Sequence, residues 1–324
     1  MKNKIIELAK QLDADLVGFA PASRFDKDDA IFKIFPNAKT VIGLGYRVLR
    51  GAYRCVEEGT TYYQYTTMGI ENLEETVMPE ALIRVSNLIE EEGYEAIPQR
   101  KNQLIMRDSD KTNPEVDYRD IMRGVTAEIQ IDFLNTAVMC GLGERSMINS
   151  LLTKEFGPFV RYCFILTDAE IEPTPLEAPS LCDKCGECIK ACPGRAISDD
   201  GELDTWRCAV YYNGANGSKN PFLPPDAYID FTNRLEIIDG TAKFDENGAK
   251  EILDSTYFYP PVKNGYRGSI CGRACDRACY IHLEEKGVLT RKFNKKFREG
   301  EDWKLSTKQF ETMTREKAWE FTKG

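Results

Sequence analysis

The chain has 324 residues, of which 42% are hydrophobic and 29% are charged, and its formal net charge is −9. This composition is typical of a globular protein and excludes a disordered or fibrous chain, while the acidic total gives no general attraction for nucleic-acid phosphates. The single histidine, His282, excludes metal sites that need several imidazole ligands. No apolar run reaches the roughly 18 residues that cross a bilayer, so we expect no membrane association.

Hydrophobic spacing predicts alternating helices and strands in the first half of the chain. Helices are expected over residues 3–12, 73–89 (with a break or a fresh start at Pro79) and 124–139. Short apolar runs predict strands at residues 16–20, 40–45, 94–97 and 160–166. The alternation predicts an α/β core over residues 1–170, with a central sheet.

The composition changes after Asp168, where a proline-containing linker leads into a cysteine-rich region. We expect a second domain over residues 171–285, with an insertion at 213–268 that is rich in Gly, Pro, Asn and aromatic residues. Residues 286–324 are predicted to form a charged C-terminal tail. Within it, the basic cluster 291–298 is interpreted as a solvated helix or a partner contact.

The second domain contains the run Cys182-x-x-Cys185-x-x-Cys188-x-x-x-Cys192-Pro193. This spacing is that of bacterial ferredoxins, in which three thiolates bind one iron–sulfur cluster and the fourth binds a neighbouring cluster. Zinc sites favour two separated Cys-x-x-Cys pairs, so zinc is the weaker interpretation.

Two clusters need eight thiolates, and the chain supplies four more in Cys208 and the run Cys-x-x-x-Cys-x-x-x-Cys near residue 275. The sequence thus predicts two [4Fe–4S] clusters, the first held by Cys182, Cys185, Cys188 and Cys279, and the second by Cys192, Cys208, Cys271 and Cys275. The second run is looser than in a ferredoxin, so exchanged assignments stay open.

The remaining thiols, Cys55, Cys140 and Cys163, lie in apolar contexts and are expected to be buried and inert. His282 is expected to hydrogen-bond a cluster sulfur or to lie at the surface, rather than to bind iron. The N-terminus resembles no signal peptide, and a cysteine-rich chain with reduced thiols is expected in the cytoplasm.

The order of segments adds a resemblance. It comprises LVGFA, NAKTVIGLGY, the run Tyr62-Tyr63-Gln64-Tyr65, GYEAIP, AVMCGLGERSMINSLLTKEFGPFVRYCFILTD, the cysteine motif and a later WRC. This order resembles the epoxyqueuosine reductase and reductive dehalogenase group of corrinoid iron–sulfur proteins. The resemblance implies a flavin-reductase-like α/β core that binds base-off cobalamin, followed by a ferredoxin-like domain whose two clusters reduce the cobalt.

Five residues around the Gly-rich segment are candidates for contacts with that cofactor. Glycines at 141, 143 and 157 would let backbone amides approach a corrin side chain or phosphate, and two polar side chains would add hydrogen bonds. The alternative is a helix C-cap at the first glycine and an ordinary turn at the last. The candidates are Gly141, Gly143, Ser146, Asn149 and Gly157.

In epoxyqueuosine reductases an aspartate upstream of this segment donates a proton, and the nearest carboxylate here is Glu128. Burial beside Ile129 would raise its pKa toward that role. A solvated helix carboxylate is the alternative, and Tyr118 or Tyr62 are substitutes as the acid.

The sequence therefore predicts a cobalamin-dependent iron–sulfur reductase that acts on an unidentified small-molecule or protein substrate. A low-potential electron donor of ferredoxin or flavodoxin type would supply its electrons. The alternatives are an electron-transfer protein that serves a partner enzyme or corrinoid protein, and a corrinoid-free fold with structural clusters. Epoxyqueuosine reductases carry a C-terminal helical-repeat extension that grips tRNA. Because few residues follow Cys279 and the net charge is negative, tRNA is not expected as a partner.

Overall fold

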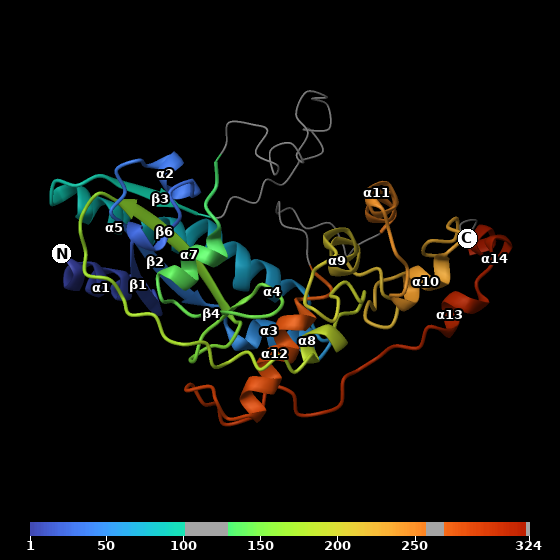
Figure 1. Cartoon of the computed structure of the whole chain (residues 1–324). Helices are drawn as coiled ribbons and strands as arrows, with labels where there is room; N and C mark the ends of the chain where they lie inside the picture. The colour runs from blue at the N-terminus through green and yellow to red at the C-terminus, as the bar shows by residue number, and fades with distance from the viewer. Residues whose placement is uncertain (101–128, 257–268, 322–324) are drawn as a thin grey trace.

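The computed structural model describes residues 1–100, 129–256 and 269–321. Its N-terminal half is built on a four-stranded sheet with the order β1-β2-β6-β3, and every neighbouring pair in it is antiparallel (Figure 1). The strands are β1 (Leu16–Pro21), β2 (Thr40–Arg47), β3 (Ala96–Gln99) and β6 (Val160–Thr167). The central strands β2 and β6 pair over their whole length, so they form the rigid centre of this half.

Helices cover both faces of the sheet. On one face, α1 (Lys2–Gln11) and α5 (Met78–Glu91) pack on alternate strand residues such as Ile42 and Ile165. On the other face, α2 (Ala30–Ile34) and α7 (Phe133–Met139) pack on Val41 and Phe164. The end of α7 lies so close to β1 that a Cβ atom added at Gly18 would lie 2.1 Å from the carbonyl oxygen of Cys140.

The predicted strands and the central sheet are confirmed, within a few residues of the expected bounds. The fold is a mixed α and β arrangement whose sheet is antiparallel, rather than the parallel sheet that regular βαβ units build. The predicted helix 124–139 is confirmed only over 133–139, as α7. It is wrong for 129–132, because the Asp132 side chain caps the helix at the Asn135 amide, and residues 124–128 lie outside the described ranges. As expected at Pro79, α5 is a fresh start, with the proline in its first turn.

The remaining elements are short. Between the sheet strands lie the 3-10 turn η1 (Ala22–Arg24), the helices α3 (Arg50–Glu57) and α4 (Tyr63–Thr66), the π-helical turns η2 (Thr67–Glu71) and η3 (Leu73–Val77), and the hairpin β4 (Glu144–Arg145) and β5 (Leu151–Leu152). The cysteine-rich half contains α8 (Glu187–Lys190), α9 (Thr205–Tyr212), α10 (Arg234–Asp239), α11 (Glu246–Ser255), α12 (Ala274–Glu285), α13 (Lys308–Thr312) and α14 (Arg315–Phe321).

A stack of aromatic rings joins the two halves. Phe159, which precedes β6, stacks on Tyr53 of α3 at 3.9 Å and on Tyr280 of α12 at 4.3 Å between ring centroids. Phe297 packs edge-on against Phe159 and Tyr280 and is fully buried. The interpretation of residues 291–298 as a solvated helix is wrong about the helix, because this segment is not helical. Residues 291–296 are exposed, as a solvated segment requires, whereas Phe297 anchors the segment in the core.

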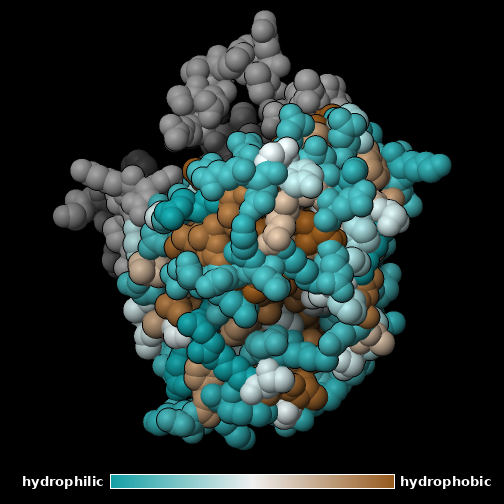
Figure 2. Space-filling view, turned by 90° about the vertical axis from the view of Figure 1, so that its left-hand side faces the viewer, coloured by the Kyte–Doolittle hydropathy of each residue, from teal (hydrophilic) through white to brown (hydrophobic). Residues whose placement is uncertain are grey.

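The face that carries α1 and α5 is mostly hydrophilic, with apolar side chains showing in separate smaller areas (Figure 2). Among the described helices, none has the length and apolar character that crossing a bilayer would require.

Candidate metal centre

The thiols that were expected to hold the first cluster gather around α8 and α12, which pack against each other. The pKa of the Cys279 thiol is raised by its burial and by the charge of Asp276. The neighbouring thiols of Cys188, Cys182 and Cys185 raise it further. An electrostatic influence of this kind requires the four side chains to lie close together. The structure thus brings these four cysteines to one place, from segments almost a hundred residues apart.

The other four thiols form a second group. Burial and the charges of Cys271 and Cys192 raise the pKa of Cys208 to about 12. Burial, Asp276 and the thiols of Cys271 and Cys208 likewise raise the pKa of Cys275. Four crowded, partly buried thiols resist ionisation, whereas iron would hold them as thiolates and offset their charge. The donor set and its grouping therefore fit two thiolate-bound clusters, although the assignment of ligands stays a prediction.

Glu144 of β4 fixes the backbone of the first cysteine loop. Its carboxylate accepts hydrogen bonds from the amides of Ser180 at 2.6 Å, Leu181 at 2.8 Å and Cys182 at 2.9 Å. Three backbone donors converge on one carboxylate, which is the charge-assisted arrangement that holds a loop most firmly. Sequence reasoning missed this role, because it depends on a contact across 36 to 38 residues.

Ser150, at the other end of the same hairpin, holds the start of α12. Its hydroxyl donates to Asp276 Oδ1 at 2.8 Å and accepts from Arg273 Nη2 at 2.9 Å, and Arg273 pairs with Asp276. Asp276 is 1% exposed, so its charge depends on these partners. The β4–β5 hairpin therefore connects the loop of the first cysteine group to the helix that carries Cys275 and Cys279.

The tip of the hairpin also covers the thiols. Ile148 and Met147 pack with Ile197 against cysteines from both groups, namely Cys188, Cys192 and Cys275. Apolar cover of this kind excludes water from a cluster and is one of the factors that set its reduction potential. Cys185 differs from its neighbours because it is exposed, so the first group reaches the surface there.

Glu57 of α3 supports the second group from the opposite side. Its buried carboxylate pairs with Arg277 at 2.7 Å and also with Arg298. Arg277 in turn donates to the carbonyl oxygens of Cys271 at 2.5 Å and Gly272 at 2.6 Å. A buried ion pair from the N-terminal half thus orients the loop that carries Cys271.

The five residues predicted to contact a cofactor lie in or beside the β4–β5 hairpin and make intramolecular contacts. A Cβ atom added at Gly143 would lie 2.2 Å from the Leu152 carbonyl oxygen, and Gly141 and Gly157 adopt positive φ values of 73° and 55°. Ser146 accepts a hydrogen bond from the Ser150 amide, and Asn149 accepts one from Arg145. None of the five lines the described cavities of about 500, 380 and 600 Å³, and their contact with a cofactor stays a prediction.

Among the predicted proton donors, Glu128 and Tyr118 lie outside the described residues. Tyr62 is buried, its hydroxyl has no hydrogen-bond partner within the described ranges, and burial raises its pKa to about 12. It therefore stays protonated at neutral pH. His282 pairs with Asp183 at 2.9 Å, and the acid also accepts from Lys286.

Two of the three remaining thiols behave as expected. Cys140 and Cys163 are fully buried in the sheet core, whereas Cys55 is only half-buried, because α3 borders a cavity. The expectation of burial is therefore wrong for Cys55.

Comparison with known proteins agrees with the cysteine geometry. Residues 178–198 match the family model described as a 4Fe-4S binding domain. The epoxyqueuosine reductase of Bacillus subtilis (strain 168) is 25% identical over 271 residues, which cover 72% of this chain and 60% of that protein. The trichloroethene reductive dehalogenase of Dehalococcoides mccartyi is 34% identical over 83 residues, which cover 24% of this chain and 15% of that protein.

The chain is an iron–sulfur protein related to the epoxyqueuosine reductases and reductive dehalogenases. The resemblance inferred from the order of motifs is thus confirmed. The chain spans about 60% of the length of the Bacillus subtilis protein and less of the dehalogenase.

The expectation that tRNA is not a partner is wrong. A similar solved structure is an epoxyqueuosine reductase with a tRNA-Tyr epoxyqueuosine-modified stem loop (TM-score 0.42, 15% identity, covering 68% of this chain and 59% of that one). The expectation rested on net charge and on the short C-terminal segment. Net charge does not describe a local basic surface, and so it does not exclude an RNA substrate.

Proposed function

We propose that this protein is a cytoplasmic iron–sulfur reductase in which two [4Fe–4S] clusters supply electrons to a bound cobalamin. The observation that carries the proposal is the gathering of eight thiols, drawn from three segments of the chain, around the packed helices α8 and α12. We further propose a flavin-reductase-like core over residues 1–170, a two-cluster domain over 171–285 and a C-terminal segment over 286–324. The antiparallel sheet with helices on both faces supports the first of these.

The exposure of the thiols gives the clusters an order. Among the eight thiols, only Cys185 of the first group is exposed, whereas all four thiols of the second group are partly buried and Cys275 packs with Ile148 and Ile197. Electrons from a donor would therefore enter at the first cluster and pass to the second. Glu144 and Ser150 act as positioning residues, because each ties a cluster-bearing segment to the same hairpin.

Cobalamin, when bound, supplies a strongly nucleophilic reduced cobalt. Within the described residues, the buried hydroxyl of Tyr62 fits a polar group of such a cofactor or its substrate, because no protein group satisfies it. With its pKa raised, Tyr62 would hold a proton until a stronger base forms beside it. Glu128 and the five hairpin residues stay candidates for the same site.

The test is anaerobic purification with iron, sulfide and hydroxocobalamin present, followed by metal analysis. The proposal predicts about eight irons per chain and one cobalt. Eight irons without cobalt would replace it with the electron-transfer function, and zinc in place of iron would contradict both. Turnover is then measured with an epoxyqueuosine-containing tRNA stem loop and with a haloalkene. Consumption of one and not the other assigns the substrate class.

A further inference from the structure

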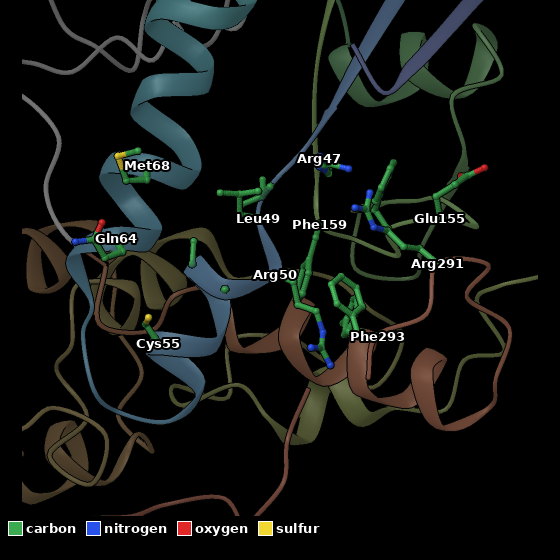
Figure 3. A pocket seen from close by; sticks show the side chains of 15 residues that line it. Arg47, Leu49, Arg50, Cys55, Gln64, Met68, Glu155, Phe159, Arg291 and Phe293 are labelled. Atoms are coloured by element: carbon green, nitrogen blue, oxygen red, sulfur yellow. The ribbon is translucent and has the colours of Figure 1, made fainter. Parts of the chain in front are cut away.

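A cavity of about 500 Å³ lies beside α3, on residues that the cluster chemistry does not use; we call it the α3 cavity. Its wall is formed by the end of β2, by α3 and by the segment that follows α12 (Figure 3). A volume of this size is typical of sites for drug-sized ligands. Tyr280 and Phe159 form part of the apolar lining.

Large apolar side chains are exposed around this cavity. Leu49, Met68 and Phe293 are 56%, 51% and 44% exposed, and all three line it. In the view of Figure 3, Leu49 and Met68 lie on one side of the cavity and Phe293 lies on the other. Apolar groups gathered in this way favour a ligand with two apolar faces, because each face would cover part of the exposed surface.

The charged lining is mainly positive. Arg47, Arg50 and Arg291 line the cavity together with a single carboxylate, that of Glu155. Arg50 is paired with Glu284 and lies 4.3 Å from the Phe293 ring centroid. Arg291 contacts the rings of Phe156 and Phe293, and no carboxylate within the described ranges forms an ion pair with it.

Arg291 is therefore left to face a ligand. Arg47 forms one ion pair at 3.5 Å with Asp15, which leaves further N–H donors of its guanidinium group for a ligand, and Figure 3 shows Arg291 extending toward the side of the cavity that carries Arg47. Arginine stacks on aromatic rings and binds carboxylate, phosphate or sulfonate groups through two parallel hydrogen bonds.

We propose that the α3 cavity binds a planar aromatic anion. The ring system lies between Leu49 and Met68 on one side and Phe293 on the other, and the anionic group is held by Arg47 and Arg291. The inference is independent of the clusters and of cobalamin, because none of the predicted cluster ligands and none of the five residues predicted to contact cobalamin lines this cavity.

A matched pair of fluorescent probes tests the proposal on the anaerobically purified full chain. Anilinonaphthalene sulfonate has a planar naphthalene ring with an anilino group and an anionic group, and N-phenyl-1-naphthylamine has the same rings without the anionic group. We expect the sulfonate to bind one site per chain at least tenfold more tightly. Arg291→Gln should remove that preference, whereas Phe293→Ala should weaken both probes alike. The control Arg315→Gln replaces an exposed arginine that does not line the cavity, and it should change the affinity of neither probe.

Cys55 supplies a second readout that needs no variant. Its half-buried thiol lines the cavity, so the bound sulfonate should slow alkylation of Cys55 by iodoacetamide at least fivefold, as followed by peptide mass spectrometry. Equal affinity for the two probes, an unchanged preference in Arg291→Gln, or an unprotected Cys55 would each overturn the proposal. Because the protection of Cys55 is measured on the unaltered chain, it tests the proposal even if a variant fails to fold.

Discussion

The contact between Glu144 and the first cysteine loop makes the sharpest prediction about how the fold supports a cluster. The substitution Glu144→Ala removes three hydrogen bonds to the amides of residues 180–182. Hydrogen bonds to charged groups contribute about 1.5–3 kcal/mol each when buried. Because this carboxylate is only partly buried, we take about 1 kcal/mol for each, or about 3 kcal/mol in total.

The loss should appear as faster opening of the loop that carries Cys182. At 1.4 kcal/mol for each factor of ten, about 3 kcal/mol corresponds to a roughly 100-fold faster loss of iron from the first cluster. The assay is anaerobic transfer of iron to a coloured chelator, followed by absorbance. We expect two phases, of which only one accelerates in Glu144→Ala. Glu202→Ala, an exposed glutamate of the same half, is the matched control. Equal acceleration of both phases, or none, would refute the reasoning.

Three further predictions follow from other contacts. Glu57→Gln breaks a buried ion pair, which costs about 3–5 kcal/mol, so we expect a lower urea midpoint and preferential loss of the second cluster; an unchanged midpoint would argue against the pairing. Gly18→Ala should lower the melting temperature by several degrees, because the new Cβ atom meets a backbone oxygen. Gly51→Ala is the control and should not lower it, because the space around that residue is open; differential scanning calorimetry measures both. Burial raises the pKa of Cys140, so its thiolate is scarce at pH 8 and its alkylation should require unfolding. The half-buried Cys55 should be alkylated in the native protein, and comparable labelling of the two thiols would contradict the burial of Cys140.

Local pattern predicted the four strands of the sheet and the helices α1 and α5 well, because each strand is a short apolar run between turns, but it missed α2, α3 and α4. It did not predict how the strands pair. The neighbour of β6 at one edge is β3, about sixty residues earlier, and such long-range pairing leaves no mark in the spacing of either segment. Cysteine spacing, in contrast, was informative, because iron–sulfur ligation fixes both the residue type of the ligands and the interval between them.

The Gly-rich segment shows where sequence reasoning stops. Its glycines suggested an approach of backbone to a cofactor, but Gly143 makes its close approach to the Leu152 carbonyl within the hairpin. The important side chain there is Glu144, whose partners lie in another segment. Phe297 is a similar case, because the charges around it indicated a solvated surface while its ring packs on Phe159.

The central claim is that eight thiols hold two separate clusters in the grouping found here. Iron content and reduced-state electron paramagnetic resonance of Cys279→Ser test it most directly. The account predicts that this variant keeps about four of about eight irons and one of two cluster signals, with the far-ultraviolet circular dichroism of the sheet half unchanged. Retention of all the iron, or loss of the signal assigned to Cys192, Cys208, Cys271 and Cys275, would contradict it.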